Sequence, residues 1–305
     1  MSRPICVIGS SNTDMVVRSQ RIPAPGETVL GGEFFLFPGG KGANQAVAAA
    51  RLGGRVQLVA CVGNDAFGKE SIERFGREGI DCSRIVTDAV APSGIAMITV
   101  DAAGENAIVV APGANGRLSE QVVTEAMDEL PADTMILLQL EIPMESVASV
   151  LQTASRRGMS VILNPAPAVK LPRDWYRHIS ILTPNEVEAS VLTGIQVEGP
   201  EAAARAATWF HDAGIPQVVI TLGRRGAYCS GPSGSFLVEA SVVTVADSTG
   251  AGDCFNGALA VALAEGRDLY KAVRFACAAA TLSVTRMGAQ PAMPNRSEVE
   301  IFHNI

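Results

Sequence analysis

The segment Asp247-Ser248-Thr249-Gly250-Ala251-Gly252-Asp253-Cys254-Phe255-Asn256 leads into a run of small and apolar residues that predicts a helix over 255–263. Its two glycines allow backbone N–H groups to converge without a Cβ in the way. A helix N-terminus of this kind favours a bound anion. Asp253 would be repelled by a phosphate there, so we expect it to take a proton from an attacking hydroxyl. The segment predicts a loop-to-helix junction that supports phosphoryl transfer without a Walker loop.

Around this junction, apolar runs of strand length alternate with helical patterns. The strand candidates are continuously apolar, as expected for strands covered on both faces. They are residues 5–8, 56–62, 135–140, 161–163, 179–182 and 218–222. The helix candidates are residues 42–52, 67–79, 119–130, 144–157, 185–192, 200–213, 252–265 and 270–285. This alternation predicts an α/β fold with a doubly wound, mostly parallel sheet flanked by helices.

Two segments break the alternation. Residues 14–37 contain prolines and glycines among short β-prone pieces at 15–17 and 28–30, and residues 92–110 predict a hairpin with strands at 95–100 and 106–110. We expect them to form a small β-sheet lid over the carboxyl ends of the parallel strands, where such folds bind ligands. The predicted division is an α/β core of residues 1–10, 38–91 and 111–305 and a lid of residues 11–37 and 92–110.

Composition narrows the function classes. A net charge of -7 argues against nucleic acid as a partner, because nucleic-acid binding needs a basic face. No apolar run reaches the length of a membrane helix, and no secretory signal is visible. The six cysteines are scattered without a Cys-x-x-Cys pair, which indicates free thiols in a reducing cytoplasm. Small-molecule chemistry in the cytoplasm is therefore expected.

A second glycine-rich stretch, Pro38-Gly39-Gly40-Lys41-Gly42-Ala43-Asn44-Gln45-Ala46, opens the first long helix. Its glycines permit close approach of the backbone to a ligand, and Lys41 supplies a mobile cation. Asn44 can offer both a donor and an acceptor to hydroxyls. The alternative is a glycine-rich turn with a solvated lysine. Because the stretch follows the predicted lid, we favour a ligand site.

Polar side chains also follow two of the predicted strands. Asn12 and Asp14 come after the first strand at a spacing of two, so in an extended segment they point the same way. Glu141 directly follows the strand predicted at 135–140. Carboxylate and amide groups at these positions suit vicinal hydroxyls, whereas an Asx-turn that closes the strand is an equal alternative.

The stretch Thr183-Pro184-Asn185-Glu186-Val187-Glu188 follows the strand predicted at 179–182. Asn185 and Glu188 are three residues apart and share one face of a helix start. Oxygen ligands of this kind suit Mg²⁺, which is usually shared with substrate phosphates. The alternative is an ordinary helix start with Thr183 as the cap and Glu186 in the first turn.

Taken together, these segments resemble the ribokinase family of sugar kinases from Ile5 to about Pro294. Two signatures carry the resemblance, residues 38–46 and 247–257, with Asn12-Thr13-Asp14 upstream and Gly288-Ala289-Gln290-Pro291 downstream. The resemblance implies ATP-dependent phosphorylation of D-ribose at O5 to give ribose 5-phosphate. It implies that Asp253 is the base and that the amides of Gly250, Ala251 and Gly252 hold the charge of the transferred phosphoryl group.

The resemblance also implies three sets of binding residues. Those matching the sugar site are Asn12, Asp14, Gly40, Lys41, Asn44 and Glu141, together with Asp253. Those matching nucleotide-binding positions are Thr221, Gly223, Gly226, Gly252 and Cys277, the last as a neighbour of adenine. Asn185 and Glu188 match the motif that organises Mg²⁺ and the phosphates.

A monovalent-cation site for K⁺ is implied beside the anion hole. Its matching positions are Asp247, Thr249, Ser283, Arg286, Gly288 and Ala292. The chain departs from the family pattern at Ala292, where a serine hydroxyl can contribute, so the site is either looser or completed by water. The lid of this family pairs between two subunits, which implies a homodimer.

Three alternatives remain at this point. The same chemistry would serve a kinase of deoxyribose, a nucleoside or another sugar. A non-catalytic sugar-binding protein would need neither Asp253 nor the glycines beside it. A nicotinamide-dependent oxidoreductase would need a glycine fingerprint after the first strand, which Gly9-Ser10-Ser11-Asn12 does not supply.

Overall fold

The computed structural model describes residues 2–303. Within them, nine strands form a central sheet in the order β13-β12-β11-β10-β9-β8-β1-β4-β5. They are β1 (Ile5–Ile8), β4 (Val56–Gly63), β5 (Asp81–Asp88), β8 (Met135–Leu138), β9 (Val161–Leu163), β10 (Ile181–Leu182), β11 (Gln217–Thr221), β12 (Ala227–Gly231) and β13 (Gly234–Val238). The neighbouring strands from β5 to β11 run parallel to one another. Strand β12 pairs antiparallel with both β11 and β13. The prediction of a mostly parallel, doubly wound sheet is confirmed.

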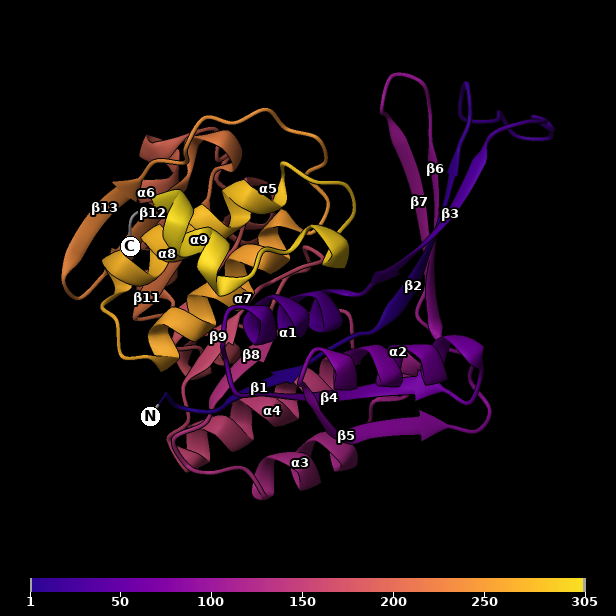
Figure 1. Cartoon of the computed structure of the whole chain (residues 1–305). Coiled ribbons are helices and arrows are strands. Elements are labelled where there is room, and N and C mark those ends of the chain that lie inside the picture. The colour runs from indigo at the N-terminus through magenta and orange to yellow at the C-terminus, as the bar shows by residue number, and fades with distance from the viewer. Residues whose placement is uncertain (1, 304–305) are drawn as a thin grey trace.

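Helices cover both faces of this sheet (Figure 1). They are α1 (Lys41–Arg51), α2 (Ala66–Arg77), α3 (Glu120–Asp128), α4 (Met144–Arg157), α5 (Glu186–Thr193), α6 (Pro200–Asp212), α7 (Ala251–Ala264), α8 (Leu269–Ser283) and α9 (Arg296–His303). Alternate residues of β1 enter two separate hydrophobic cores: Ile5 and Val7 pack with α1, α7 and α8, whereas Cys6 and Ile8 pack with α3, α4 and α6. Burial on both faces explains why the strand sequences are continuously apolar.

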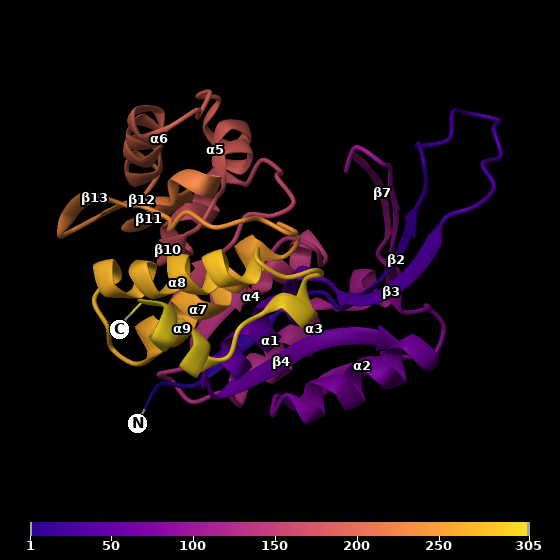
Figure 2. The ribbon, with the colours of Figure 1, turned by 45° about the horizontal axis from the view of Figure 1, so that its top comes forward.

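A second, four-stranded sheet has the order β3-β2-β6-β7. Its strands are β2 (Asn12–Arg18), β3 (Glu33–Gly39), β6 (Gly94–Val100) and β7 (Asn106–Ala111). The central pair, β2 and β6, is parallel and the outer pairs are antiparallel. In both views this sheet rises from the core on the side away from β13 (Figures 1 and 2). The predicted separate small β-sheet is thus present, and we call these four strands the lid sheet.

The structure corrects the predicted strands in three places. The β-prone piece at 28–30 is not a strand; the chain pairs later, at β3, where Phe35 lies opposite Val16. The edge strand β5 was not predicted, because its sequence, DCSRIVTD, is charged and partly exposed. The antiparallel pair β12 and β13 was also not predicted, since both strands are short and rich in glycine and serine. None of the helices described in residues 2–303 is long and apolar enough to cross a membrane.

Candidate active site

The two glycine-rich stretches meet at the carboxyl ends of the parallel strands. Gly40 is the N-cap of α1, and Gly250 is the N-cap of α7 in a left-handed conformation with φ of 74°. A Cβ at Gly250 would lie only 2.9 Å from Cβ of Ala289, so glycine is required there for both conformation and space. The N-terminus of α7 is therefore held against the turn that contains Ala289.

Among the described residues, several backbone N–H groups at the start of α7 have no hydrogen-bond acceptor. The amide of Ala251 donates to Ser248 O at 3.2 Å, and the amide of Cys254 donates to Gly250 O at 2.8 Å. In the part of the chain that the structure describes, the amides of Gly250, Gly252 and Asp253 have no acceptor. Free amides at a helix N-terminus are the arrangement that binds phosphate.

Asp253 lies in this first turn and is buried, with 7% of its surface exposed. Its Oδ2 accepts a hydrogen bond from Asn44 Nδ2 at 2.9 Å, and its Oδ1 accepts one from Gln45 Nε2 at 3.0 Å. Burial raises the pKa of Asp253, while Lys41 and the two amide donors act in the opposite direction. Each carboxylate oxygen keeps a free lone pair, so a substrate hydroxyl can still hydrogen-bond there.

Lys41 is the cation around which the acidic groups of the site gather. Burial opposes its charged form, yet the carboxylates around it raise its pKa. These carboxylates are those of Asp253, Glu141, Glu188 and Asp14. Four acidic groups around one lysine leave an excess of negative charge, which a magnesium–nucleotide complex or a hydroxyl-rich ligand would help to offset.

Asp14 is a second acid of the site whose pKa is raised. Burial and the neighbouring Glu141 and Asp253 raise its pKa from 3.8 to about 6, against the pull of Lys41. Its carboxylate lies beside Gly39, where an added Cβ would come within 2.3 Å. No hydrogen bond to this carboxylate exists within residues 2–303. A half-buried, unpaired carboxylate in a site is available to accept ligand hydroxyls.

Asn12 and Glu141 are tied to the scaffold. Asn12 Oδ1 accepts from Asn115 Nδ2 at 2.7 Å. Glu141 Oε2 accepts from the amide of Lys41 at 3.0 Å and from Ser10 Oγ at 2.5 Å. Glu141 therefore fixes the start of α1, and the sugar-site residues predicted from the sequence converge on one region around Lys41.

Asn185 and Glu188 form a capping box at the start of α5. Asn185 Oδ1 accepts from the amide of Glu188 at 2.8 Å, and Glu188 Oε2 accepts from the amide of Asn185 at 2.8 Å. The cap is therefore Asn185, and the alternative with Thr183 as the cap is wrong. Burial raises the pKa of Glu188, and the nearby Lys41 lowers it. The all-oxygen character and remaining lone pairs of these groups fit Mg²⁺.

The predicted nucleotide positions lie further along the same edge of the sheet. Thr221 ends β11 and forms an isolated bridge with Asn185. The amide of Thr221 donates to Pro184 O at 3.0 Å. Gly223 and Gly226 bound the short turn that follows. Cys277 is buried in α8, where burial raises the pKa of its thiol to about 12. The end of β11 is thus continuous with the capping box, whereas Cys277 belongs to the helix layer.

Two of the predicted cation positions, Thr249 and Gly288, are joined to a third, Asp247, by hydrogen bonds. Asp247 Oδ1 accepts from the amide and Oγ1 of Thr249, at 2.9 and 2.7 Å, and Oδ2 accepts from the amide of Gly288 at 2.8 Å. Although burial acts against it, these bonds hold the pKa of Asp247 below its usual value. Ser283 Oγ donates to Ala280 O, and the Arg286 side chain pairs with Glu298.

Ala292 is fully buried in this same region and brings no side-chain oxygen. Any contribution from Arg286 or Ala292 to a cation must therefore come from backbone carbonyls, whereas the hydroxyl oxygen of Ser283 keeps its lone pairs. Within residues 2–303, no three His, Cys, Asp or Glu side chains gather to hold a metal ion.

Four buried amide side chains support this site and were missed in the sequence. They are Gln45, Gln139, Asn164 and Gln290. Gln290 Nε2 donates to Asn44 Oδ1 at 3.1 Å, and the other three form a chain behind Asp253. A neutral amide in an apolar run such as MILLQL carries no chemical signal by itself. Only the pairing of Gln45 with Asn44 in the glycine-rich stretch gave a hint of its position.

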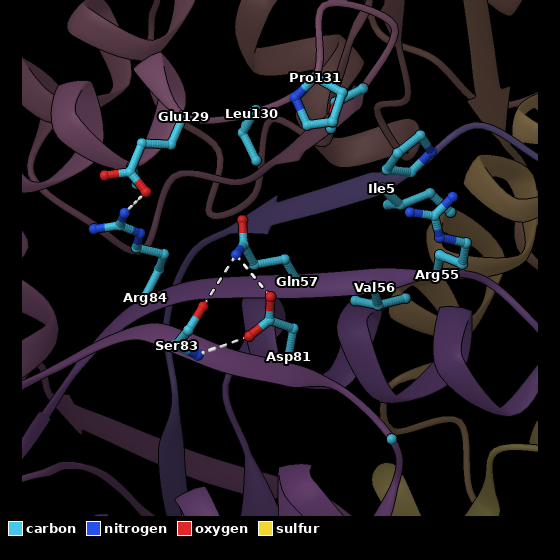
Figure 3. A pocket seen from close by; sticks show the side chains of 14 residues that line it. Ile5, Arg55, Val56, Gln57, Asp81, Ser83, Arg84, Glu129, Leu130 and Pro131 are labelled. Carbon is cyan, nitrogen blue, oxygen red and sulfur yellow. Dashed lines mark hydrogen bonds and ion pairs between the residues drawn. The ribbon is translucent and has the colours of Figure 1, made fainter.

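A cavity of about 790 Å³ lies at the opposite edge of the central sheet, at the amino ends of β1, β4 and β5 (Figure 3). Arg84 pairs there with Glu129, and Gln57 Nε2 donates to Asp81 Oδ2 at 2.9 Å (Figure 3). None of the predicted site residues lines this cavity. It is separate from the candidate active site.

Comparison with known proteins gives consistent matches over the whole chain. The model of the pfkB family of carbohydrate kinases matches residues 2–296. The ribokinase of Haemophilus influenzae is 43% identical over 302 residues, covering 99% of each chain. That of Bacillus subtilis is 44% identical over 298 residues, covering 98% of each. The structure of Arabidopsis thaliana ribokinase complexed with ribose and ATP has a TM-score of 0.90 at 33% identity, covering 99% of each chain.

Proposed function

The chain belongs to the pfkB family of carbohydrate kinases, and on this premise we propose that it transfers the γ-phosphoryl group of ATP to O5 of D-ribose. The products are ribose 5-phosphate and ADP. The six cysteines are free thiols, which suits the reducing cytoplasm as the place of the reaction.

One observation carries the proposal: a buried carboxylate, Asp253, stands in the first turn of a helix whose amides are free. The carboxylate accepts the proton of the attacking hydroxyl as the oxygen–phosphorus bond forms. The free amides of Gly250 and Gly252 stabilise the charge on the transferred phosphoryl group, whereas the amide of Ala251, which the resemblance also implied, already donates to Ser248 O. Because the amides are fixed by the α7 N-cap, they need no rearrangement during the reaction.

The sugar is recognised by the groups around Lys41. Asp14 and Glu141 accept hydrogen bonds from the sugar hydroxyls, while Asn12 and Asn44 offer amides with both donors and acceptors. Gly40 allows the ligand to approach the backbone at the start of α1. The unpaired carboxylate of Asp14 makes a hydroxyl-rich ligand the natural occupant, because each accepted hydrogen bond stabilises its ionised form.

The nucleotide lies along the end of β11, in contact with Thr221, Gly223 and Gly226 and close to Cys277. Asn185 and Glu188 would hold Mg²⁺ through their oxygen atoms, at a position that the ion would share with the phosphates of ATP. When bound, the ion neutralises phosphate charge and orients the γ-phosphoryl group. The protein's part is to fix both residues in one capping box, so that their oxygens keep a constant spacing.

A monovalent cation, K⁺, binds beside the α7 N-terminus. Asp247, Thr249 and the carbonyls of Ser283, Arg286, Gly288 and Ala292 would hold it. Ser248 and Thr249 join Asp247 to Gly250, so the cation supports the anion hole. With alanine at 292, backbone oxygen or water takes the place of a hydroxyl ligand.

The lid sheet covers the sugar and pairs with the lid of a second copy. One face of the lid sheet is apolar and uncovered in the single chain: Phe34 is 59% exposed, Met97 59% and Val109 70%. In the strand register, Val17 lies opposite Phe34, and Met97 lies opposite Val109. Asp14 is on the other face, because it is an odd number of residues from Val17.

A contiguous apolar face of this kind is typical of a surface that another chain covers. A homodimer would bury it and hold each lid over its own sugar. Light scattering should therefore give twice the chain's 31.7 kDa, and a stable monomer at the concentrations of the assay would contradict the dimer.

A panel of acceptors tests the proposed reaction. The purified protein is given ATP and Mg²⁺, with or without K⁺, and D-ribose, 2-deoxyribose, other pentoses or nucleosides. We expect the highest kcat/KM with D-ribose and faster turnover with K⁺. A wide preference for 2-deoxyribose or a nucleoside would overturn the substrate, and no phosphorylation of any acceptor would overturn the reaction.

A further inference from the structure

Three buried amide side chains form a hydrogen-bonded chain behind Asp253. Gln139 Nε2 donates to Gln45 Oε1 at 2.7 Å, and Gln45 Nε2 donates both to Asn164 Oδ1 at 3.2 Å and to Asp253 Oδ1 at 3.0 Å. Gln45 and Gln139 are completely buried. Every hydrogen-bonding capacity of the Gln45 amide, except one lone pair, is thereby used.

The direction of this chain is fixed by a backbone group. Asn164 Nδ2 donates to Thr183 O at 3.1 Å, and a carbonyl can only accept. Asn164 must therefore turn its oxygen toward Gln45. That orientation requires the NH₂ group of Gln45 to face both Asn164 and Asp253, since the opposite orientation would place oxygen against oxygen at both contacts.

The two oxygens of Asp253 are consequently different. Oδ1 is held by Gln45, which no solvent reaches, whereas Oδ2 is held by Asn44 on the sugar side of the site. Asn44 is itself oriented by Gln290, through a bond of 3.1 Å to its Oδ1. Neutral amide donors act on both oxygens, but only the Oδ2 side borders the sugar-binding groups.

We propose that Gln45 is a positioning residue that holds Oδ1 of Asp253 throughout the reaction, so that Oδ2 is the atom that receives the proton. This inference rests on the proposed role of Asp253 as the base. In the step, the O–H bond of the sugar hydroxyl breaks and its proton passes to Oδ2. The electron pair stays on the sugar oxygen, which bonds to phosphorus as the bond from phosphorus to the ADP oxygen breaks.

Loss of the Gln45 amide should make the base harder to ionise. The charged groups that act on Asp253 come from several elements and remain unchanged in such a variant. They are Lys41 of α1, Glu141 after β8, Asp14 of β2 and Glu188 of α5, together with the thiol of Cys254. A hydrogen bond to a charged group contributes about 1.5 to 3 kcal/mol, which corresponds to a shift of about one to two pH units.

The test is the pH dependence of kcat/KM for Gln45→Met, which nearly preserves the side-chain volume. We expect the acid limb of the profile to move about one to two pH units upward, with KM for the sugar within about threefold of wild type. The matched control is Gln139→Met. It removes an equally buried amide of the same chain, but Asn164 still orients Gln45, so its acid limb should stay at the wild-type position.

An acid limb of Gln45→Met that coincides with wild type, even at reduced kcat, would overturn the proposal, because a merely structural role lowers activity without moving the limb. If Gln45→Met does not fold, as judged by circular dichroism, Gln45→Leu takes its place. Should both fail to fold, Gln45→Ser with its small hydroxyl is measured in the same way.

A second measurement separates this proposal from the proposed function. The ¹³C NMR titration of Asp253, assigned by comparison with Asp253→Asn, reports its protonation without any substrate. If the pKa of Asp253 is higher in Gln45→Met than in wild type but the wild-type protein does not phosphorylate ribose, the positioning role of Gln45 stands and the proposed substrate is wrong. If the wild-type protein phosphorylates ribose but the pKa of Asp253 is the same in Gln45→Met as in wild type, only the positioning role of Gln45 is wrong.

Discussion

Replacement of Asp14 by asparagine should stabilise the ligand-free protein, although it removes a group that we propose binds the sugar. Burial and the carboxylates of Glu141 and Asp253 raise the pKa of Asp14 from 3.8 to about 6. A shift of about two units corresponds to about 3 kcal/mol at a pH where the group is ionised in both the folded and the unfolded chain. Asp14→Asn keeps the shape of the side chain and removes the charge.

The sign follows from proton binding. Between about pH 4 and pH 6 the folded protein binds the proton of Asp14 more tightly than the unfolded chain does, so stability falls as pH rises through this window. Below pH 4 the carboxyl group is neutral in both states, and the penalty is absent. The stabilisation by Asp14→Asn should therefore be near zero at about pH 4 and reach about 3 kcal/mol at pH 8.

Urea unfolding of wild type and Asp14→Asn, without sugar, nucleotide or magnesium, measures this difference at several pH values. The matched control is Asp133→Asn, an exposed aspartate whose substitution should change stability equally at both ends of the range. The same Asp14→Asn protein should show a raised KM for ribose. A variant no more stable than wild type at pH 8, or a gain that does not vary between pH 4 and pH 8, would refute the electrostatic reasoning.

Two further substitutions probe the anion hole and the cation site. Gly250→Ala should lower the free energy of unfolding by about 1 to 2 kcal/mol, because a Cβ there meets a left-handed backbone and lies 2.9 Å from Cβ of Ala289. Unchanged urea unfolding and unchanged kcat would contradict this. Ala292→Ser should lower the K⁺ concentration that gives half-maximal activity, since it adds an oxygen at a buried position that we propose lies beside the cation. A K⁺ dependence identical to wild type would show that residue 292 does not face the ion.

The sequence predicted the interior of the fold better than its edges. Strands β1, β4, β8 and β9 are buried on both faces, so their apolar runs are visible without any knowledge of their partners. Edge and lid strands depend on pairing instead. β5 is charged and partly exposed, and the piece at 28–30 has strand-like residues but no partner strand.

The chemistry of the site was visible where a residue type is itself unusual in its place. A carboxylate beside two glycines at Asp253 and a lysine among glycines at Lys41 both drew attention. Gln45 did not, because its role comes from a contact with a residue 208 positions away. Gln139 and Asn164 likewise act only through the tertiary structure that sets the direction of their hydrogen bonds.

Turnover of Asp253→Asn with ATP and D-ribose shows whether Asp253 takes the proton of the sugar hydroxyl. Formation of ribose 5-phosphate in a single turnover is measured beside calorimetric titrations of ribose and ATP. The account predicts a rate about 10²- to 10⁴-fold below wild type, with both ligands still bound. A rate within a few-fold of wild type, at undiminished binding, would contradict it.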